Sequence, residues 1–323
     1  MKTKILGRTG LEVPIVGMGA AFVGIPEPNL AVLEYGGQPG QMDIELGMKA
    51  VHDAIEAGCT FIDTARLYGF GHSEEIIGRA LKARPDLAAR AIVTTKVGQS
   101  HNLTRDFSYD AILRDVEHSQ KRLGIEQFQI LYIHDAMGFS MDLMLGEFGA
   151  LAALRKLQKE GAVRFLGSAS NDPETNADYL ETGEFDAAVS ADSWSMLNQF
   201  AACRVLPAAE KHNIGIVTAT PLERGLLATG PAPGTEYLDR NFSPACLEQV
   251  TRIQQLCQDH GIPMVAAALQ WCTRHPQVAT TIPGARTPKE AVENIRAGEI
   301  EIPEAFWKEL EPFIRHWEAG VDR

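Results

Sequence analysis

The sequence predicts a (β/α)8 barrel, and three observations carry that prediction. Short apolar runs rich in β-branched residues alternate with stretches whose apolar residues recur at helical spacing, and 323 residues hold eight such pairs. Three successive apolar runs end in an ionisable residue, namely Asp63, Lys96 and His134. The carboxyl ends of parallel strands share one face, where active sites of barrels and open sheets lie. A doubly wound open sheet is the second candidate, and the lack of an early G-x-G-x-x-G after a strand counts against it.

Length and composition bound the alternatives. With 45% hydrophobic residues and no linker-like stretch, residues 1–323 are expected to form one domain. No run reaches the roughly 18 apolar residues of a membrane span, and the amino terminus lacks the apolar core of a signal peptide, so we expect a cytoplasmic protein. Five cysteines without a CxxC pair predict reduced thiols and no metal site. A net charge of −12 argues against nucleic-acid and anionic membrane partners.

The expected elements follow in chain order. A hairpin is expected at 5–13 and the first barrel strand at 13–19, where the terminal Gly19 lets backbone approach a ligand closely. The long segment 20–42 carries glycine and proline and is expected to shape a substrate pocket. Further strands are expected at 60–63, 91–95, 128–133, 163–166, within 183–189, at 214–218 and at 278–282. Helices are expected at 43–58, 73–81, 108–123, 147–160 and 201–211, with extra helices at 244–260 and 263–274 before the eighth strand and another at the C-terminus.

The residues at the strand ends suit hydride transfer at a carbonyl or alcohol. This reaction needs a group that exchanges the proton of the oxygen, and Tyr68, in the loop after Asp63, is the candidate. Lys96 would lower the pKa of Tyr68 from its usual value near 10, and Asp63 would keep the lysine charged and oriented. His134 would position the substrate oxygen as a neutral imidazole. Taken singly, each of these residue types is more often a packing or surface group.

These four residues resemble the catalytic tetrad of the aldo-keto reductase superfamily, an Asp, Tyr, Lys and His in this order on successive strand ends. Flanking segments similar to the family's follow in the same order at 74–81, 167–171 and 282–294. The resemblance covers almost the whole chain and is greatest to the aldose 1-dehydrogenase branch, of the L-fucose or D-threo-aldose type. The runs 134–135, 266–270 and 306–307 carry that finer likeness. The family's fold is the (β/α)8 barrel, with a hairpin that closes the barrel floor.

The resemblance also implies where a nicotinamide cofactor binds. Ser168 and Asn171 correspond to the fifth-strand segment that bonds the nicotinamide carboxamide, and Asn171 is the firmer match. The segment 220–225 resembles the family's pyrophosphate loop, whose backbone N–H groups suit an anion. The expected cofactor contacts are therefore Gly19, Ser168, Asn171, Thr220, Leu222, Gly225, Gly284, Arg286, Glu290, Glu293 and Asn294.

Two positions depart from the family's cofactor site. Ala219 stands where many members stack an aromatic residue on the nicotinamide, and Ala191 stands where a sixth-strand glutamine is common. Trp194 is a candidate to cover the ring from the side or to form a pocket wall. Together with Phe22 and His101, it is expected to line the substrate pocket.

The segment 282–294 predicts a preference for NAD(H) over NADP(H). In NADP-using relatives that resemble this segment, an arginine stands at the position of Glu290. A Lys-Ser pair stands in those relatives where this chain has Gly284 and Ala285. A carboxylate repels the 2′-phosphate and accepts a hydrogen bond from a free ribose hydroxyl. Arg286 and Lys289 are near enough in sequence to hold a phosphate, so NADP stays possible.

The resemblance implies that the enzyme oxidises a free aldose at C1 to the lactone, with Tyr68 as general base and hydride transfer to NAD⁺. This would be a reaction of carbohydrate metabolism with a small-molecule substrate. A reductase of small aldehydes or ketones and a dehydrogenase of a pyridoxal-like aldehyde are alternatives within the class. A non-catalytic accessory subunit on the same barrel is a different class, for which the acidic chain offers no docking feature. No pattern in the chain specifies an oligomeric state.

Overall fold

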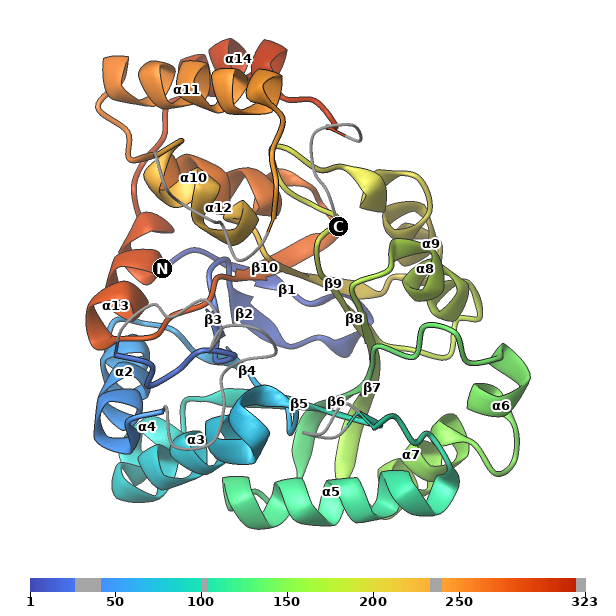
Figure 1. Ribbon diagram of the computed structural model, residues 1–323. Coiled ribbons are helices and arrows are strands. Elements are labelled where there is room, and N and C mark those ends of the chain that lie inside the picture. The colour runs from blue at the N-terminus through green and yellow to red at the C-terminus, as the bar shows by residue number, and fades with distance from the viewer. Residues whose placement is uncertain (27–41, 100–103, 233–239, 318–323) are drawn as a thin grey trace.

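Eight parallel strands form a barrel surrounded by helices (Figure 1). The computed structural model describes residues 1–26, 42–99, 104–232 and 240–317. Neighbouring strands pair in chain order, and they are β3 (Met18–Gly19), β4 (Phe61–Asp63), β5 (Ile92–Val97), β6 (Phe128–His134), β7 (Val163–Ser170), β8 (Ala187–Ser190), β9 (Gly215–Ala219) and β10 (Val278–Ile282). Parallel bridges from Val16 to Thr281 and from Gly19 to Gly284 bring the first and last strands together. The predicted (β/α)8 barrel is confirmed.

Amphipathic helices cover the outside of the strands (Figure 1). The larger ones are α2 (Ile44–Glu56), α3 (His72–Ala83), α5 (Tyr109–Leu123), α7 (Ala150–Lys159), α8 (Pro173–Glu181), α9 (Val205–His212), α11 (Pro244–Asp259), α12 (Met264–Arg274) and α13 (Pro288–Ala297). The shorter ones are α4 (Pro85–Ala88), α6 (Met141–Leu145), α10 (Leu226–Thr229) and α14 (Glu304–Leu310). The extra helices α11 and α14 lie together outside the ring (Figure 1). In the part of the chain that the structure describes, no helix is long and apolar enough to cross a membrane.

Several boundaries differ from the sequence prediction. The first barrel strand is only Met18–Gly19, because residues 13–14 belong to the hairpin strand β2 (Glu12–Pro14), which pairs with β1 (Thr3–Ile5). β7 continues to Ser170, four residues beyond its predicted end, and α7 begins at Ala150 instead of residue 147. Helices α6 and α8 were missed in the prediction, although Asp172 before Pro173 is a helix-start signal and its carboxylate does accept a hydrogen bond from the backbone N–H of Thr175. The sixth strand, Ala187–Ser190, lies at the end of the predicted stretch 183–189 and extends one residue beyond it.

The hairpin closes the amino-terminal end of the barrel. Leu6 and Val13 from the hairpin join the apolar cluster that fills the barrel, whose other buried members are Phe61, Ile130, Tyr132, Ala169, Ala187, Val189, Val217, Ala279 and Ile282. Lys4 Nζ donates to the carbonyl oxygens of Thr273, His275 and Val278, where α12 ends and β10 begins. The opposite end, at the carboxyl termini of the strands, is therefore left for a ligand.

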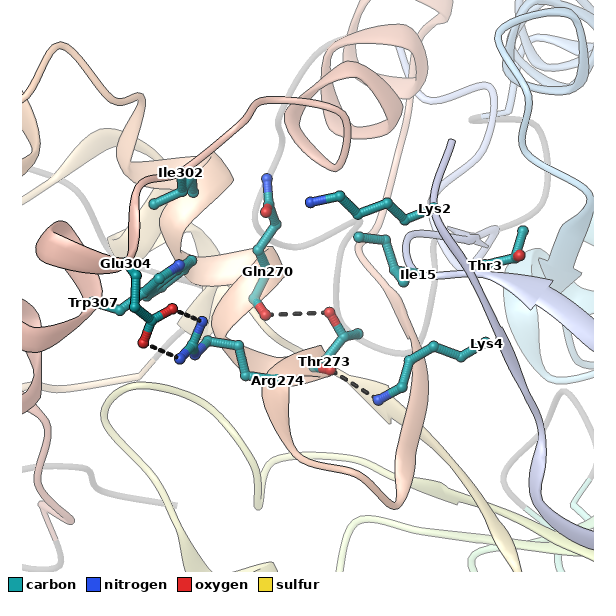
Figure 2. A pocket seen from close by; sticks show the side chains of 10 residues that line it. All are labelled: Lys2, Thr3, Lys4, Ile15, Gln270, Thr273, Arg274, Ile302, Glu304 and Trp307. Atoms are coloured by element: carbon teal, nitrogen blue, oxygen red, sulfur yellow. Dashed lines mark hydrogen bonds and ion pairs between the residues drawn. The ribbon is translucent and has the colours of Figure 1, made fainter.

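A hollow of about 510 Å³ lies at the hairpin end (Figure 2). It lies between β1, α12 and α14, and its charged lining groups include Lys4, Arg274 and Glu304. Arg274 pairs with Glu304 at 3.1 Å and lies over the Trp307 ring, while Lys4 is held by backbone carbonyls. These charged groups already serve structural contacts, and the hollow is at the other end of the barrel from Asp63 and His134.

Gly78 of α3 provides a direct test of the helix packing. A Cβ at this position would lie 2.0 Å from the carbonyl oxygen of Arg122 in α5. We predict that Gly78→Ala lowers the free energy of unfolding by about 1–3 kcal/mol, although alanine is the better helix former. Urea denaturation measures the change, with the exposed Lys82→Ala on the same helix as a control expected to stay within about 0.5 kcal/mol. A Gly78→Ala protein as stable as wild type would contradict the close helix contact.

Candidate active site

Four ionisable side chains meet at the carboxyl end of the barrel. Asp63 ends β4, Lys96 lies in β5, and His134 ends β6. In each strand, the side chain two positions earlier faces the barrel interior. Because side chains alternate between the two faces of a strand, these three side chains face the interior as well. Tyr68 begins a short 3-10 turn (Tyr68–Gly71) just after β4. The structure therefore brings together the four residues that the sequence singled out.

Asp63 and Lys96 form a buried ion pair, and each is only 2% exposed. Lys96 Nζ also donates to the carbonyl oxygen of Thr64 at 3.0 Å, and Thr94 Oγ1 donates to Asp63 at 2.9 Å. Burial raises the pKa of Asp63, and the charge of Lys96 opposes that rise. Burial lowers the pKa of Lys96, but the Asp63 charge and the Tyr68 phenol outweigh it, so the net pKa is raised. The lysine is held as a cation inside the barrel.

Lys96 links this pair to Tyr68. Its Nζ lies 3.2 Å from the Tyr68 hydroxyl and 4.8 Å from the centre of the ring. Burial raises the pKa of Tyr68, Lys96 lowers it, and the Asp63 carboxylate raises it again. The net pKa is above its usual value, which differs from the lowering expected from Lys96 alone. The Tyr68 phenol is consequently protonated at neutral pH.

His134 faces the tyrosine with the edge of its ring. The two ring centres are 5.9 Å apart and the ring planes are 87° to one another. Burial, together with the nearby Lys96 charge, holds the pKa of His134 well below its usual value. The imidazole is neutral near pH 7, which is the form that a group positioning a substrate oxygen needs.

Asn171 and Ser168 at the end of β7 point in different directions. Asn171 donates to Asp135 from its backbone N–H at 2.9 Å, which holds it beside His134. Ser168 is 1% exposed and its hydroxyl donates to Asn176 of α8 at 2.6 Å. Strand alternation therefore turns the Ser168 side chain toward the helix layer, and its contact with a cofactor stays a prediction.

The loop after β9 has an unusual backbone. Thr220, Glu223 and Arg224 adopt left-handed φ values of 59°, 46° and 56°, and Gly225 follows at 100°. Such values are rare outside glycine, and successive turns of this kind aim backbone N–H groups at one point. Leu222 packs between the main core and the cluster under α11 and α12. Within the loop, however, the N–H groups of Glu223 and Gly225 already donate to the carbonyl oxygens of Thr220 and Leu222, so an anion would have to bind other backbone groups here.

Glycines from both ends of the chain meet at the barrel mouth. Gly19 donates its N–H to Pro283 at 2.9 Å, and its own carbonyl accepts from Ala285. Asn294 of α13 donates to the carbonyl oxygen of Gly284 at 3.2 Å, and the Phe22 ring lies beside Gly284.

Two acidic residues of α13 have different surroundings. Glu290 accepts from the backbone N–H of Arg286 at 2.8 Å and from its Nε at 3.1 Å. Glu293 is exposed, 3.8 Å from Lys289. The charge of Arg286 is therefore largely matched within the protein.

Trp194 lies away from these residues. Its ring stacks on Trp271 with 5.0 Å between ring centres, and its Nε1 donates to the Cys272 carbonyl at 3.0 Å, both in α12. With 8% of its surface exposed, it is a packing residue between the loop after β8 and α12. The expected role of Trp194 as a wall of the substrate pocket is not supported, and His101 falls outside the described residues.

Sequence and structure comparisons place this arrangement in a known family. The profile of the aldo/keto reductase family matches residues 32–315. The chain belongs to this family. It is 28% identical to the pyridoxal 4-dehydrogenase of Microbacterium luteolum, over 95% of this chain and 96% of the relative. It is 29% identical to the D-threo-aldose 1-dehydrogenase of a Pseudomonas species, over 93% and 94%.

A solved structure agrees on the fold. The holo form of the aldo-keto reductase AKR11C1 from Bacillus halodurans superposes with a TM-score of 0.79 at 23% identity, covering 99% of both chains. As a member of the family, this aldo-keto reductase is an NAD(P)-dependent oxidoreductase.

The mouth of this aldo-keto reductase barrel fits a nicotinamide dinucleotide. The absence of a side chain at Gly284 leaves backbone open beside the Phe22 ring, and the left-handed loop 220–225 follows β9 at the same end of the barrel. Asn171, beside Asp135, and Asn294, beside Gly284, add amide side chains to the barrel mouth. A bound dinucleotide would supply or accept the hydride, and these residues are the ones that would hold it.

A second carboxylate, Asp115 of α5, contacts the loop that carries Tyr68 and the segment that follows β5, the strand of Lys96. Asp115 forms an ion pair with Arg66, two residues before Tyr68. It also accepts from the backbone N–H of Gly98 at 2.9 Å, two residues after Lys96. This contact was not predicted from the sequence, because an arginine in a loop shows no sign of a partner 49 positions away in a helix.

Removing Lys96 should reveal the cost of burying Asp63. We predict that Lys96→Met lowers the free energy of unfolding by about 3–5 kcal/mol, since it leaves a buried carboxylate without its cation. The double variant Lys96→Met/Asp63→Asn should recover most of that loss. Denaturant unfolding measures both, with Lys121→Met, which removes an exposed pair to Glu117, as a control expected to cost less than about 1 kcal/mol.

The double variant decides the interpretation. If it is less stable than Lys96→Met alone, the two side chains do not form the coupled pair described above.

Proposed function

We propose that this aldo-keto reductase oxidises a free aldose at C1 to the lactone, with NAD⁺ as hydride acceptor and Tyr68 as the general base. The observation that carries the proposal is the 3.2 Å contact between the Tyr68 hydroxyl and the buried Lys96 cation. A buried cation stabilises the phenolate that must exist for part of the reaction cycle.

Each of the four residues has one task in this reaction. The Tyr68 phenolate accepts the proton of the substrate hydroxyl as hydride leaves the same carbon for the nicotinamide. Lys96 stabilises the negative charge on the phenolate oxygen, and Asp63 keeps Lys96 charged and in place. His134, as a neutral imidazole, donates a hydrogen bond to the substrate oxygen and orients it. Both directions of the reaction pass through one transition state, so the same groups serve reduction.

The chemistry that aldoses and pyridoxal share supports formation of a lactone. Aldoses and pyridoxal each carry an aldehyde and a hydroxyl group that closes onto it, so both form internal hemiacetals. Oxidation of the hemiacetal carbon gives a lactone in either case. Two similar relatives are named for dehydrogenation of these compounds. Pyridoxal therefore belongs among the substrates to be tested beside the sugars.

Reduction of small aldehydes or ketones is the second candidate, and one observation favours it. The pKa of Tyr68 is raised, mainly by burial, so the phenol holds its proton at neutral pH. A protonated phenol is the acid that a carbonyl oxygen needs during reduction. An accessory barrel without activity is the least favoured, because it would gain nothing from burying Lys96 against Tyr68.

A substrate panel tests the proposal. Pentoses, hexoses, 6-deoxyhexoses, pyridoxal and simple alcohols are compared with NAD⁺, and small aldehydes with NADH. We predict that at least one aldose is oxidised faster than any simple alcohol and that its lactone is trapped with hydroxylamine. If only aldehyde reduction is found, the second candidate replaces the first.

Tyr68→Phe tests the proton-transfer group in the same assay. It should reduce turnover by about 100-fold or more, since it removes the only proposed acid–base atom. Binding of the cofactor, followed by quenching of tryptophan fluorescence, should be unchanged. Turnover within tenfold of wild type would remove Tyr68 from the mechanism.

The surroundings of Arg286 support a preference for NAD(H). Its guanidinium is paired with Glu290 through Nε and Nη2, so a 2′-phosphate that approaches Arg286 also meets the negative charge of this carboxylate. The same carboxylate suits a free ribose hydroxyl as an acceptor. Losing one charge-assisted contact and gaining one repulsion is worth roughly 2–4 kcal/mol, or on the order of 30- to 1000-fold in kcat/KM.

A pair of variants tests this cofactor preference. Glu290→Gln keeps the shape of the side chain but removes its charge, and we predict that it raises kcat/KM for NADP⁺ by roughly tenfold or more. Adding Arg286→Met should cancel the gain, because the freed guanidinium is what would bind the phosphate. Glu301→Gln, at an exposed position, is the control for net charge. Equal or better use of NADP⁺ by the wild type would overturn the preference.

A further inference from the structure

Asp135, the residue after His134, carries a carboxylate that the proposed chemistry does not use. Its backbone adopts a φ of 46°, a left-handed value that few residues other than glycine, asparagine and aspartate adopt and that clusters at functional sites. Its Oδ2 lies 3.8 Å from His134 Nε2, and the residue is 8% exposed. The turn after β6 thus places a carboxylate beside the imidazole instead of sending it into the helix layer.

Neighbouring residues hold Asp135 in place without neutralising it. Its Oδ1 accepts from the backbone N–H of Asn171 at 2.9 Å, and its carbonyl oxygen accepts from Arg105 at 3.2 Å. The carboxylate is close enough to raise the pKa of Tyr68. Among the described residues, the only basic side chain in direct contact with the carboxylate is His134, whose ring is neutral. Burial raises the pKa of Asp135, and the charges of Lys96 and Arg105 oppose that rise. A negative charge therefore stands next to the reacting groups.

This carboxylate retains capacity to accept hydrogen bonds. A carboxylate has about four acceptor positions, and Asn171 N–H fills one of them well. The amide of Asn171 reaches Oδ2 only at 3.5 Å, which is long for a hydrogen bond. A largely buried acceptor gains most from a donor that arrives with the ligand. His134 Nε2 and Asp135 Oδ2 are close enough for two neighbouring hydroxyl groups of one substrate to bond both.

We propose that Asp135 determines specificity by accepting a hydrogen bond from the hydroxyl group on the carbon next to the reacting carbon. The ligand class is a 2-hydroxy carbonyl compound or its hemiacetal, of which aldoses are the most common. The inference rests on the proposed proton transfer at Tyr68, with His134 at the reacting oxygen. Asp135 selects the substrate, and Tyr68 performs the proton transfer.

The test compares each hydroxylated substrate with its deoxy counterpart. In oxidation, the best aldose is compared with its 2-deoxy form. In reduction, lactaldehyde (2-hydroxypropanal) is compared with propionaldehyde, which lacks only the 2-hydroxyl group. Wild type should prefer the hydroxylated member by about 10- to 100-fold in kcat/KM, the usual effect of one hydrogen bond to a charged group. Asp135→Asn keeps an acceptor for Asn171 but loses the charge, so this preference should fall to within about threefold.

Control measurements separate selection from folding and from cofactor binding. Asp142→Asn, an exposed aspartate of α6, makes the same change in net charge and should keep the wild-type preference. Thermal unfolding and tryptophan quenching by cofactor should be similar in all three proteins. If Asp135→Asn slows both members of a pair equally, or weakens cofactor binding instead, Asp135 serves only to hold Asn171 and the proposal is overturned.

The reductive pair also separates this inference from the proposed function. If no aldose is oxidised but the preference for lactaldehyde disappears in Asp135→Asn, aldose oxidation fails and the role of Asp135 stands. If the variant keeps the wild-type preference, the role of Asp135 is overturned whatever the reaction direction.

Discussion

The buried ion pair between Asp63 and Lys96 is the interaction on which the rest of the site depends. Burying two charges is costly unless both are paired and their remaining hydrogen-bonding groups are satisfied. The barrel meets that condition with groups from two adjacent strands, since Asp63 aligns with Thr94 in the register of β4 and β5. Lys96 follows Thr94 by two residues and therefore enters the same interior face. Only a lysine fixed in this way can meet the Tyr68 hydroxyl at a defined distance.

The same burial sets the charges of the neighbouring groups. Tyr68 keeps its proton and His134 stays neutral, so Lys96 is the cation at the centre of the site. A substrate oxygen that enters between the Tyr68 and His134 rings would meet the Tyr68 hydroxyl, which can donate or accept a proton, and the neutral His134 imidazole. Asp115, through Arg66 and the Gly98 N–H, holds the loop that carries Tyr68 and the end of β5, the strand of Lys96. The geometry at the mouth is thus determined partly by a helix on the outside of the barrel.

The sequence was sufficient for the features that depend on local pattern. Apolar runs ending in Asp63, Lys96 and His134 imply one shared face, because parallel strands all end on the same side of a barrel. The direction of Ser168 was not predictable, since it depends on where Gly167 packs against Tyr132 inside the barrel. The packing of Trp194 against α12 and the ion pair of Arg66 with Asp115 are long-range contacts, and no local sequence pattern predicts them. The net pKa shift of Tyr68 depends on its depth of burial, which no motif records.

The pH dependence of hydride transfer in both directions is the most direct test of this account. Single-turnover rates with wild type should rise with pH in oxidation, where the Tyr68 phenolate is required. In reduction they should fall with pH, where the phenol must hold its proton. Both profiles should share one pKa well above the value of about 6.5 that is usual for histidine. Rates independent of pH in both directions, or a shared pKa near 6.5, would contradict the assignment of proton transfer to the tyrosine that contacts Lys96.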